Sequence, residues 1–156
     1  MRPKSIVRFE QAYLGSIIVW AIGLATGWGS RTQMIETNPA FAGNPQMLGL
    51  AQTVMIGFSL FMLALWLLLW YFTARKASEV TKWIIVAFFA LSVVGLPFAL
   101  MAYERAGLLA TGLTLLMFAL NAYAVWMLFQ PDARTWFNGG DTAEHTIADS
   151  DAPPLP

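Results

Sequence analysis

Side chains able to do chemistry are few in this chain. His145 is the only histidine, there is no cysteine, and His145 has no second ligand at metal-site spacing. Ser16, Ser59 and Ser92 lie in apolar stretches that hold no histidine or lysine to act as a base. No Gly-x-Ser-x-Gly or phosphate-loop pattern occurs. We therefore expect no catalytic residue, no metal ligand and no cofactor, and a protein that is not an enzyme.

Asn121 is the most polar residue deep inside an apolar stretch. Counting about 1.5 Å per helical residue places Asn121, Ser59 and Ser16 at similar depth in a membrane, and Thr114 shares the helical face of Asn121. These residues form a candidate polar seam: Ser16, Ser59, Thr114 and Asn121. The favoured interpretation is interhelical hydrogen bonding, and the alternative is a substrate site.

Small residues predict close helix packing in the first apolar stretch. Gly23 and Gly27 form a GxxxG pattern, and Gly49, Thr53 and Gly57 make a second stripe in the next stretch. Packing within the chain is favoured over a dimer seam.

Two other residues stand out. Pro97, beside Gly95, predicts a kink in the third apolar stretch, either static or used for gating. Glu10, two positions after Arg8, is interpreted as an interfacial charge that snorkels toward water. The alternative for Glu10 is the membrane carboxylate used by small four-helix exporters.

Four long charge-free stretches must position all of these residues. They are Gln11–Ser30, Thr37–Ala74, Trp83–Tyr103 and Ala106–Pro131, in a chain that is 58% hydrophobic and 12% charged. Each stretch holds an apolar run near the ~20 residues that span a bilayer as a helix. We predict an all-α, up-down-up-down bundle of four transmembrane helices, with spans at about 9–28, 47–72, 83–103 and 107–129. A cleaved signal peptide is the alternative for the first span.

Basic residues predict the orientation of the bundle. Seven basic residues lie on the side of the termini, against Arg31 and Arg105 on the other side: Arg2, Lys4, Arg8, Arg75, Lys76, Lys82 and Arg134. The positive-inside rule therefore places both termini in the cytoplasm, in a bacterial inner membrane.

The remaining segments are predicted to be loops and a tail. Asn38-Pro39 and Gly43-Asn44-Pro45 indicate that an outer loop lies on the membrane surface between the first two spans. Residues 1–138 are assigned to the membrane domain and residues 139–156 to a disordered, acidic, proline-containing cytoplasmic tail.

The end of the fourth span resembles that of small uncharacterised bacterial four-helix membrane proteins. The shared features lie in Leu128-Phe129-Gln130-Pro131-Asp132-Ala133-Arg134-Thr135-Trp136-Phe137. The resemblance implies a multi-span membrane protein and no particular activity.

The sequence thus predicts an accessory or assembly component of a larger membrane system, acting without catalysis. The alternative is a small carrier or lipid-handling protein working as an oligomer. Its partners would be the lipid bilayer and a membrane protein or second copy, and the zero net charge gives no reason to expect nucleic acid. A dry bundle would suit the first function, and a groove between spans the second.

Overall fold

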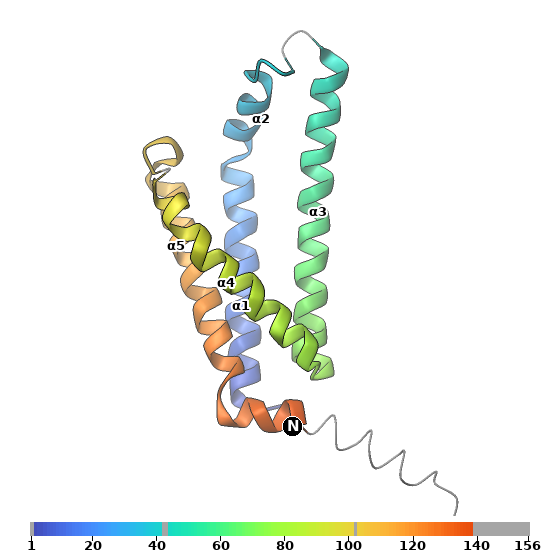
Figure 1. Ribbon diagram of the computed structural model, residues 1–156, viewed down its shortest axis with the longest axis vertical. Helices are drawn as coiled ribbons and strands as arrows, with labels where there is room; N and C mark the ends of the chain where they lie inside the picture. Colours follow the sequence, from blue (N-terminus) through green and yellow to red (C-terminus); the bar gives the residue numbers. More distant parts are fainter. Residues whose placement is uncertain (1, 42–43, 102, 139–156) are drawn as a thin grey trace, which may run out of the picture.

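The computed structural model describes residues 2–41, 44–101 and 103–138, and all regular structure there is helical (Figure 1). A short helix over residues 131–138 follows five longer ones. These are α1 (Lys4–Thr26), α2 (Trp28–Glu36), α3 (Pro45–Lys76), α4 (Glu79–Met101) and α5 (Tyr103–Leu128).

Four of the helices are long and apolar enough to cross a membrane. They are Lys4–Thr26, Pro45–Lys76, Glu79–Met101 and Gly107–Leu128, so the predicted all-α fold with four spans is confirmed. Every span boundary lies within five residues of the predicted one. The predicted disordered tail, residues 139–156, lies outside the described residues.

The four spans form a ring of neighbours whose chain direction alternates (Figure 1). α1 makes its most extensive contact with α5 and also contacts α3, while α4 contacts α3 and α5. The rings of Trp20 and Trp66 meet edge to face at 4.9 Å between α1 and α3. The short α3–α4 link and the α4–α5 connection make these sequential helices spatial neighbours.

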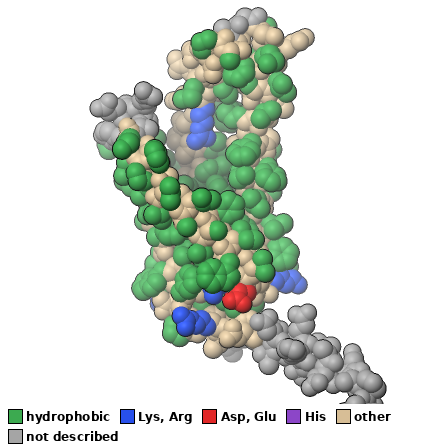
Figure 2. Space-filling model, in the orientation of Figure 1, with side chains coloured by type: hydrophobic (Ala, Val, Ile, Leu, Met, Phe, Trp, Pro, Cys, Tyr) green, Lys and Arg blue, Asp and Glu red, His purple; other side chains and the backbone are tan. Residues whose placement is uncertain are grey.

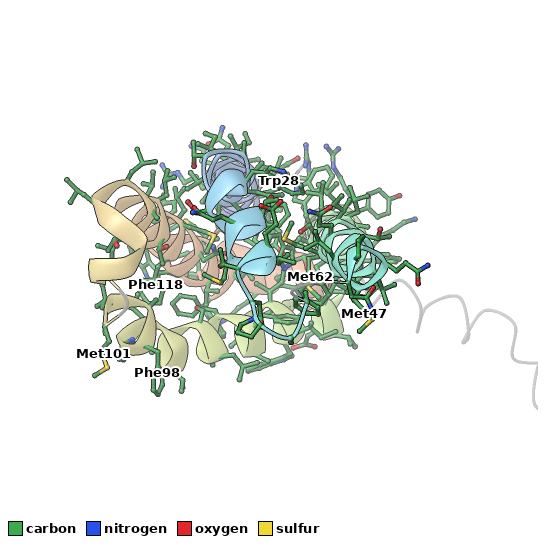
Figure 3. The ribbon with its side chains drawn as sticks, turned by 90° about the horizontal axis from the view of Figure 1, so that it is seen from above. Trp28, Met47, Met62, Phe98, Met101 and Phe118 are labelled. Atoms are coloured by element: carbon green, nitrogen blue, oxygen red, sulfur yellow. The ribbon has the colours of Figure 1, made fainter. Side chains whose placement is uncertain are left out.

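The buried core sits at one end of the bundle. Ile6, Phe9 and Leu128 have no exposed surface, and Thr73 beside them is equally enclosed. Toward the other end the apolar side chains of α3 and α4 are mostly exposed, as Phe98 and Met101 show by pointing away from the bundle (Figure 3). In a bilayer such side chains face lipid. The bundle is therefore closed at the end where α1 begins and looser at the opposite end.

The connection after the first span begins with a helix, α2, which limits the predicted loop to the residues after Glu36. α2 is stacked on the end of α1 and runs in the same direction (Figure 1). Nothing between Gly29 and Glu36 terminates a helix, because the turn-forming residues begin only at Asn38. Asn44 then caps α3, its Oδ1 accepting from the N–H groups of Gln46 and Met47 at 3.2 and 3.3 Å.

The α3–α4 turn depends on one residue in an unusual conformation. Ala77 ends α3 with φ of 52°, a left-handed value that usually calls for glycine. Inside the turn, the Thr73 hydroxyl donates to Thr81 Oγ1 at 2.9 Å, and both side chains are buried. The turn is thus fixed by a hydrogen bond across it rather than by glycine.

The helix over residues 131–138 crosses beneath the bundle (Figure 1). Helix α5 ends at Leu128, and Pro131 lies in the first turn of the next helix. Ala133 and Phe137 are buried in the core. Phe137 is only 3% exposed, so it packs inside the protein and not among lipid headgroups.

Candidate functional site

A groove of about 310 Å³ lies between the spans. Figure 2 shows the molecule hollowed between the arm formed by α4 and α5 and the arm formed by α2 and α3. Fifteen residues line the groove, and none of them is charged: Tyr13, Ser16, Ile17, Trp66, Ile85, Phe88, Phe89, Ser92, Gly95, Leu96, Ala99, Thr114, Met117, Phe118 and Asn121.

Helices α4 and α5 supply most of the groove wall. Phe118 reaches from α5 toward α4, where its ring lies 5.3 Å from that of Phe89 (Figure 3). On α4, Phe88, Ser92, Gly95 and Ala99 line the groove and are also exposed. The groove is therefore accessible along α4 from the surrounding lipid.

Polar atoms in the groove bond mainly to their own helices. The Ser16 hydroxyl donates to the Tyr13 carbonyl at 2.7 Å and lies 3.5 Å from Asn121 Oδ1, a long contact. Asn121 Nδ2 donates to the Met117 carbonyl at 2.8 Å, and the Thr114 hydroxyl donates to the Ala110 carbonyl at 2.9 Å. The groups that remain are the lone pairs of the hydroxyl groups, the second N–H and the Oδ1 of Asn121, and the hydroxyl of Tyr13. Such groups can orient a weakly polar atom.

The structure brings together three of the four residues of the predicted seam. Ser16, Thr114 and Asn121 line the groove, whereas Ser59 does not and donates instead to the Met55 carbonyl at 2.8 Å. Trp66 is the only residue of α3 in the lining, and Ser59 lies about 10 Å from it along the helix axis. The bonding role of the seam stays a prediction.

The glycines of α1 face other parts of the same chain. A Cβ on Gly23 would lie 3.8 Å from Leu113 of α5, and one on Gly27 would lie 3.0 Å from the Gly23 carbonyl oxygen. Gly49 and Gly57 on α3 have no such neighbour within 4 Å. Gly23 thus lies against α5, whereas the neighbours of Gly27 are Gly23 and Arg31, and the α3 stripe faces open space.

Helix α4 continues through Pro97 to Met101. Gly95 and Leu96 line the groove while Pro97 is exposed. The Ser92 hydroxyl donates to the Phe89 carbonyl at 2.7 Å, and not to the carbonyl of Val93 that a proline at 97 leaves free. A gating role for Pro97 stays a prediction.

Charged side chains join the helices at the closed end. Glu10 accepts from Arg2 at 2.6 Å and from Arg75 at 3.3 Å, so it connects the chain start to the end of α3. Its side chain is 15% exposed. The interpretation of Glu10 as an interfacial charge that snorkels stays a prediction, and its partner Arg75, 65 positions away, could not be named from sequence spacing.

Asp132 caps the first helix. Its carboxylate accepts from the Ser5 N–H at 3.1 Å, where α1 otherwise has no side-chain cap. This hydrogen bond to the Ser5 backbone lowers the pKa of Asp132. Sequence reasoning missed the pair, although an uncapped helix start and an acidic residue on the same predicted side were both visible.

Lys82 lies in a box of three aromatic rings. Its Nζ is 5.0 Å from the ring centroid of Phe137, 5.1 Å from that of Phe129 and 5.8 Å from that of Trp83. The residue is 7% exposed. Each cation–π contact contributes about 0.5–2 kcal/mol, whereas burying an unpaired ammonium costs several kcal/mol. The rings therefore offset only part of the cost of burial.

The fold and the groove define a small multi-span integral membrane protein in contact with the lipid bilayer. No protein-family model, curated protein or solved structure matches the chain. Within the part of the chain that the structure describes, no three metal-ligating side chains are grouped.

Proposed function

We propose that this protein binds a lipid chain, or a similarly linear apolar molecule, in the groove between its spans and acts without catalysis. The observation that carries the proposal is an uncharged, mostly apolar groove of about 310 Å³. This volume is at the lower end of the range for small-molecule sites. Tyr13, Ser16 and Asn121 at its floor supply the few polar groups that orient a ligand.

The size of the groove favours a chain-like ligand over a partner helix. A transmembrane helix is about 10 Å across and 30 Å long, which is on the order of 2,000 Å³. The groove holds only a fraction of that volume. A strongly polar substrate is disfavoured as well, because no charged side chain lines the groove.

A groove between spans is the feature expected of a carrier or lipid-handling protein rather than of a dry structural bundle. The accessory or assembly role stays as the second candidate. It is favoured by the α3 stripe, where Gly49, Thr53 and Gly57 are exposed, which would allow the backbone of a membrane partner or of a second copy to approach.

The proposed membrane is the bacterial inner membrane, with both termini cytoplasmic. At the closed end of the bundle lie the starts of α1 and α4, the end of α3 and the helix over residues 131–138, which together carry most of the basic residues. Arg31 lies on α2, at the opposite end. This distribution supports the orientation through the positive-inside rule.

Filling the groove tests the function. Gly95→Leu places a branched side chain in the groove, and Gly112→Leu is the matched control, since Gly112 is exposed, does not line the groove and also has no neighbour within 4 Å. The probe is phosphatidylcholine with a photoreactive group in its acyl chain, and mass spectrometry maps the labelled residues.

In the unaltered chain we expect labelling at Met117 and Phe118. Gly95→Leu should reduce that labelling about tenfold, while Gly112→Leu should leave it unchanged. Equal labelling in all three proteins would contradict the proposal.

A further inference from the structure

We propose that Lys82 binds the phosphate of a phospholipid in the leaflet at the closed end of the bundle, and so selects an anionic headgroup for the groove's ligand. This deepens the proposed function, and it rests on that function for the lipid chain that accompanies the headgroup. The observation behind it is a lysine that is only 7% exposed, whose ammonium lies among three aromatic rings and pairs with no carboxylate of the described residues.

No carboxylate of the described residues pairs with Lys82. Both ion pairs found there belong to Glu10, with Arg2 and Arg75 as its partners. The Asp132 carboxylate accepts from the Ser5 backbone. Glu79, one turn before Lys82 on α4, forms no ion pair with it. A lysine enclosed to this degree normally has an anionic partner, and a lipid phosphate would supply one.

Other groups at the same end also lack an acceptor. Trp70 Nε1 and Trp136 Nε1 are fully enclosed without a hydrogen-bond partner in the described residues. Both can donate a hydrogen bond. The Lys82 ammonium is not among these enclosed atoms, so it is the group that an incoming ligand can reach. The enclosed indole N–H groups are not available to a ligand, so the Lys82 ammonium alone would contact a phosphate.

The position of Lys82 on α4 connects it to the groove. Lys82, Ile85 and Phe89 follow one another at three- and four-residue spacing, so they share a helix face. Ile85 and Phe89 line the groove. Lys82 is thus about 4.5 Å along the axis from the first groove residue on its helix. In a phospholipid, the phosphate and the first carbons of the acyl chains lie at neighbouring depths in the membrane. That spacing matches the short distance between Lys82 and the groove.

The test compares headgroups on the purified full chain. Delipidated protein is offered phosphatidylglycerol and phosphatidylcholine in equal amounts, and native mass spectrometry counts each lipid retained. Lys82→Gln removes the charge, Lys82→Arg keeps it, and Lys76→Gln is the control, an exposed lysine at the same end.

We expect the unaltered chain, Lys82→Arg and Lys76→Gln to prefer phosphatidylglycerol about tenfold. Lys82→Gln should bind the two lipids equally. An unchanged preference in Lys82→Gln would overturn the proposal. So would displacement of phosphatidylglycerol by inorganic phosphate, because the site would then serve a soluble anion.

If Lys82→Gln does not fold, photolabelling of the unaltered chain tests the proposal instead. Phosphatidylglycerol with a photoreactive headgroup should label residues around Lys82 and Trp83, and labelling elsewhere only would overturn the proposal. The two proposals fail separately. If Lys82→Gln loses the headgroup preference while the acyl-chain probe still labels Gly95→Leu fully, only the groove proposal is contradicted. If Lys82→Gln keeps the preference while labelling of Gly95→Leu falls, only the phosphate site is contradicted.

Discussion

At the scale of single residues, local sequence explains the polar seam only in part. Asn121 and Ser16 were predicted to share a layer, and the structure places them 3.5 Å apart, with the shorter bonds made to their own helices. Lys82 could not be interpreted from its neighbours, because two of its rings come from Phe129 and Phe137, far along the chain. Helical spacing predicts depth and face, but not such distant contacts.

Replacing Asn121 by leucine tests whether the seam stabilises the bundle. We expect the free energy of unfolding to fall by about 0.6 kcal/mol, the average for hydrogen bonds between membrane helices, since the contact to Ser16 is long. Thermal unfolding in detergent measures the change. Thr111→Val is the control, because the Thr111 hydroxyl donates only to its own helix, at the Gly107 carbonyl. No difference between the Asn121 variant and the unaltered chain would contradict the bonding role.

Replacing Ala77 by glycine should stabilise the protein. A left-handed conformation costs a residue with a Cβ about 1–2 kcal/mol, and glycine avoids most of that cost. Thermal unfolding should therefore shift upward. At Ala64, an exposed position inside α3, the same change should destabilise by about 1 kcal/mol. A similar loss at both positions would show that Ala77 is not left-handed in the folded protein.

At the scale of helices, the four spans were predictable and the two short helices were not. Charge-free stretches about long enough to cross a bilayer leave few alternatives to a spanning helix. The predicted span boundaries therefore lie within five residues of the observed ones. α2 was not predicted because nine residues, Trp28–Glu36, are too few for a clear periodic signal beside the turn formers that begin at Asn38. The helix over residues 131–138 is too short for a periodic signal, and it is held by burial of Ala133 and Phe137.

The contact between this short helix and α1 should depend on pH. Because the pKa of Asp132 is lowered in the folded protein, its contribution to stability is present above its ordinary value of about 3.9 and is lost as the pH falls through the folded value. Asp132→Asn should therefore lower thermal stability at neutral pH and lose less stability on acidification than the unaltered chain does. Parallel acid profiles for the two proteins would contradict the assigned role of Asp132.

At the scale of the whole molecule, the bundle is asymmetric. Its core, its ion pairs and the helix beneath it gather at one end, while the groove is accessible along α4 nearer the other. Composition and charge-free stretches predicted the bundle. The groove depends on the separation between the helices, and no sequence pattern predicts that separation.

The proposed orientation can be tested with single cysteines, because the chain has none of its own. Gln33 on α2 and Thr135 in the helix over residues 131–138 are both exposed. In intact cells, a maleimide that cannot cross the membrane should label Gln33→Cys and not Thr135→Cys, and both should react after the cells are opened. Labelling of Thr135→Cys in intact cells would reverse the orientation.

The cap that Asp132 places on α1 also sets an order of assembly. Translation produces Ser5 long before Asp132, and the fourth span must be made before residue 132 leaves the ribosome. The first helix is therefore made before the partner of its Ser5 N–H exists. Closure of the bundle at this end is consequently a late event in biosynthesis, reached only when the last span has been inserted.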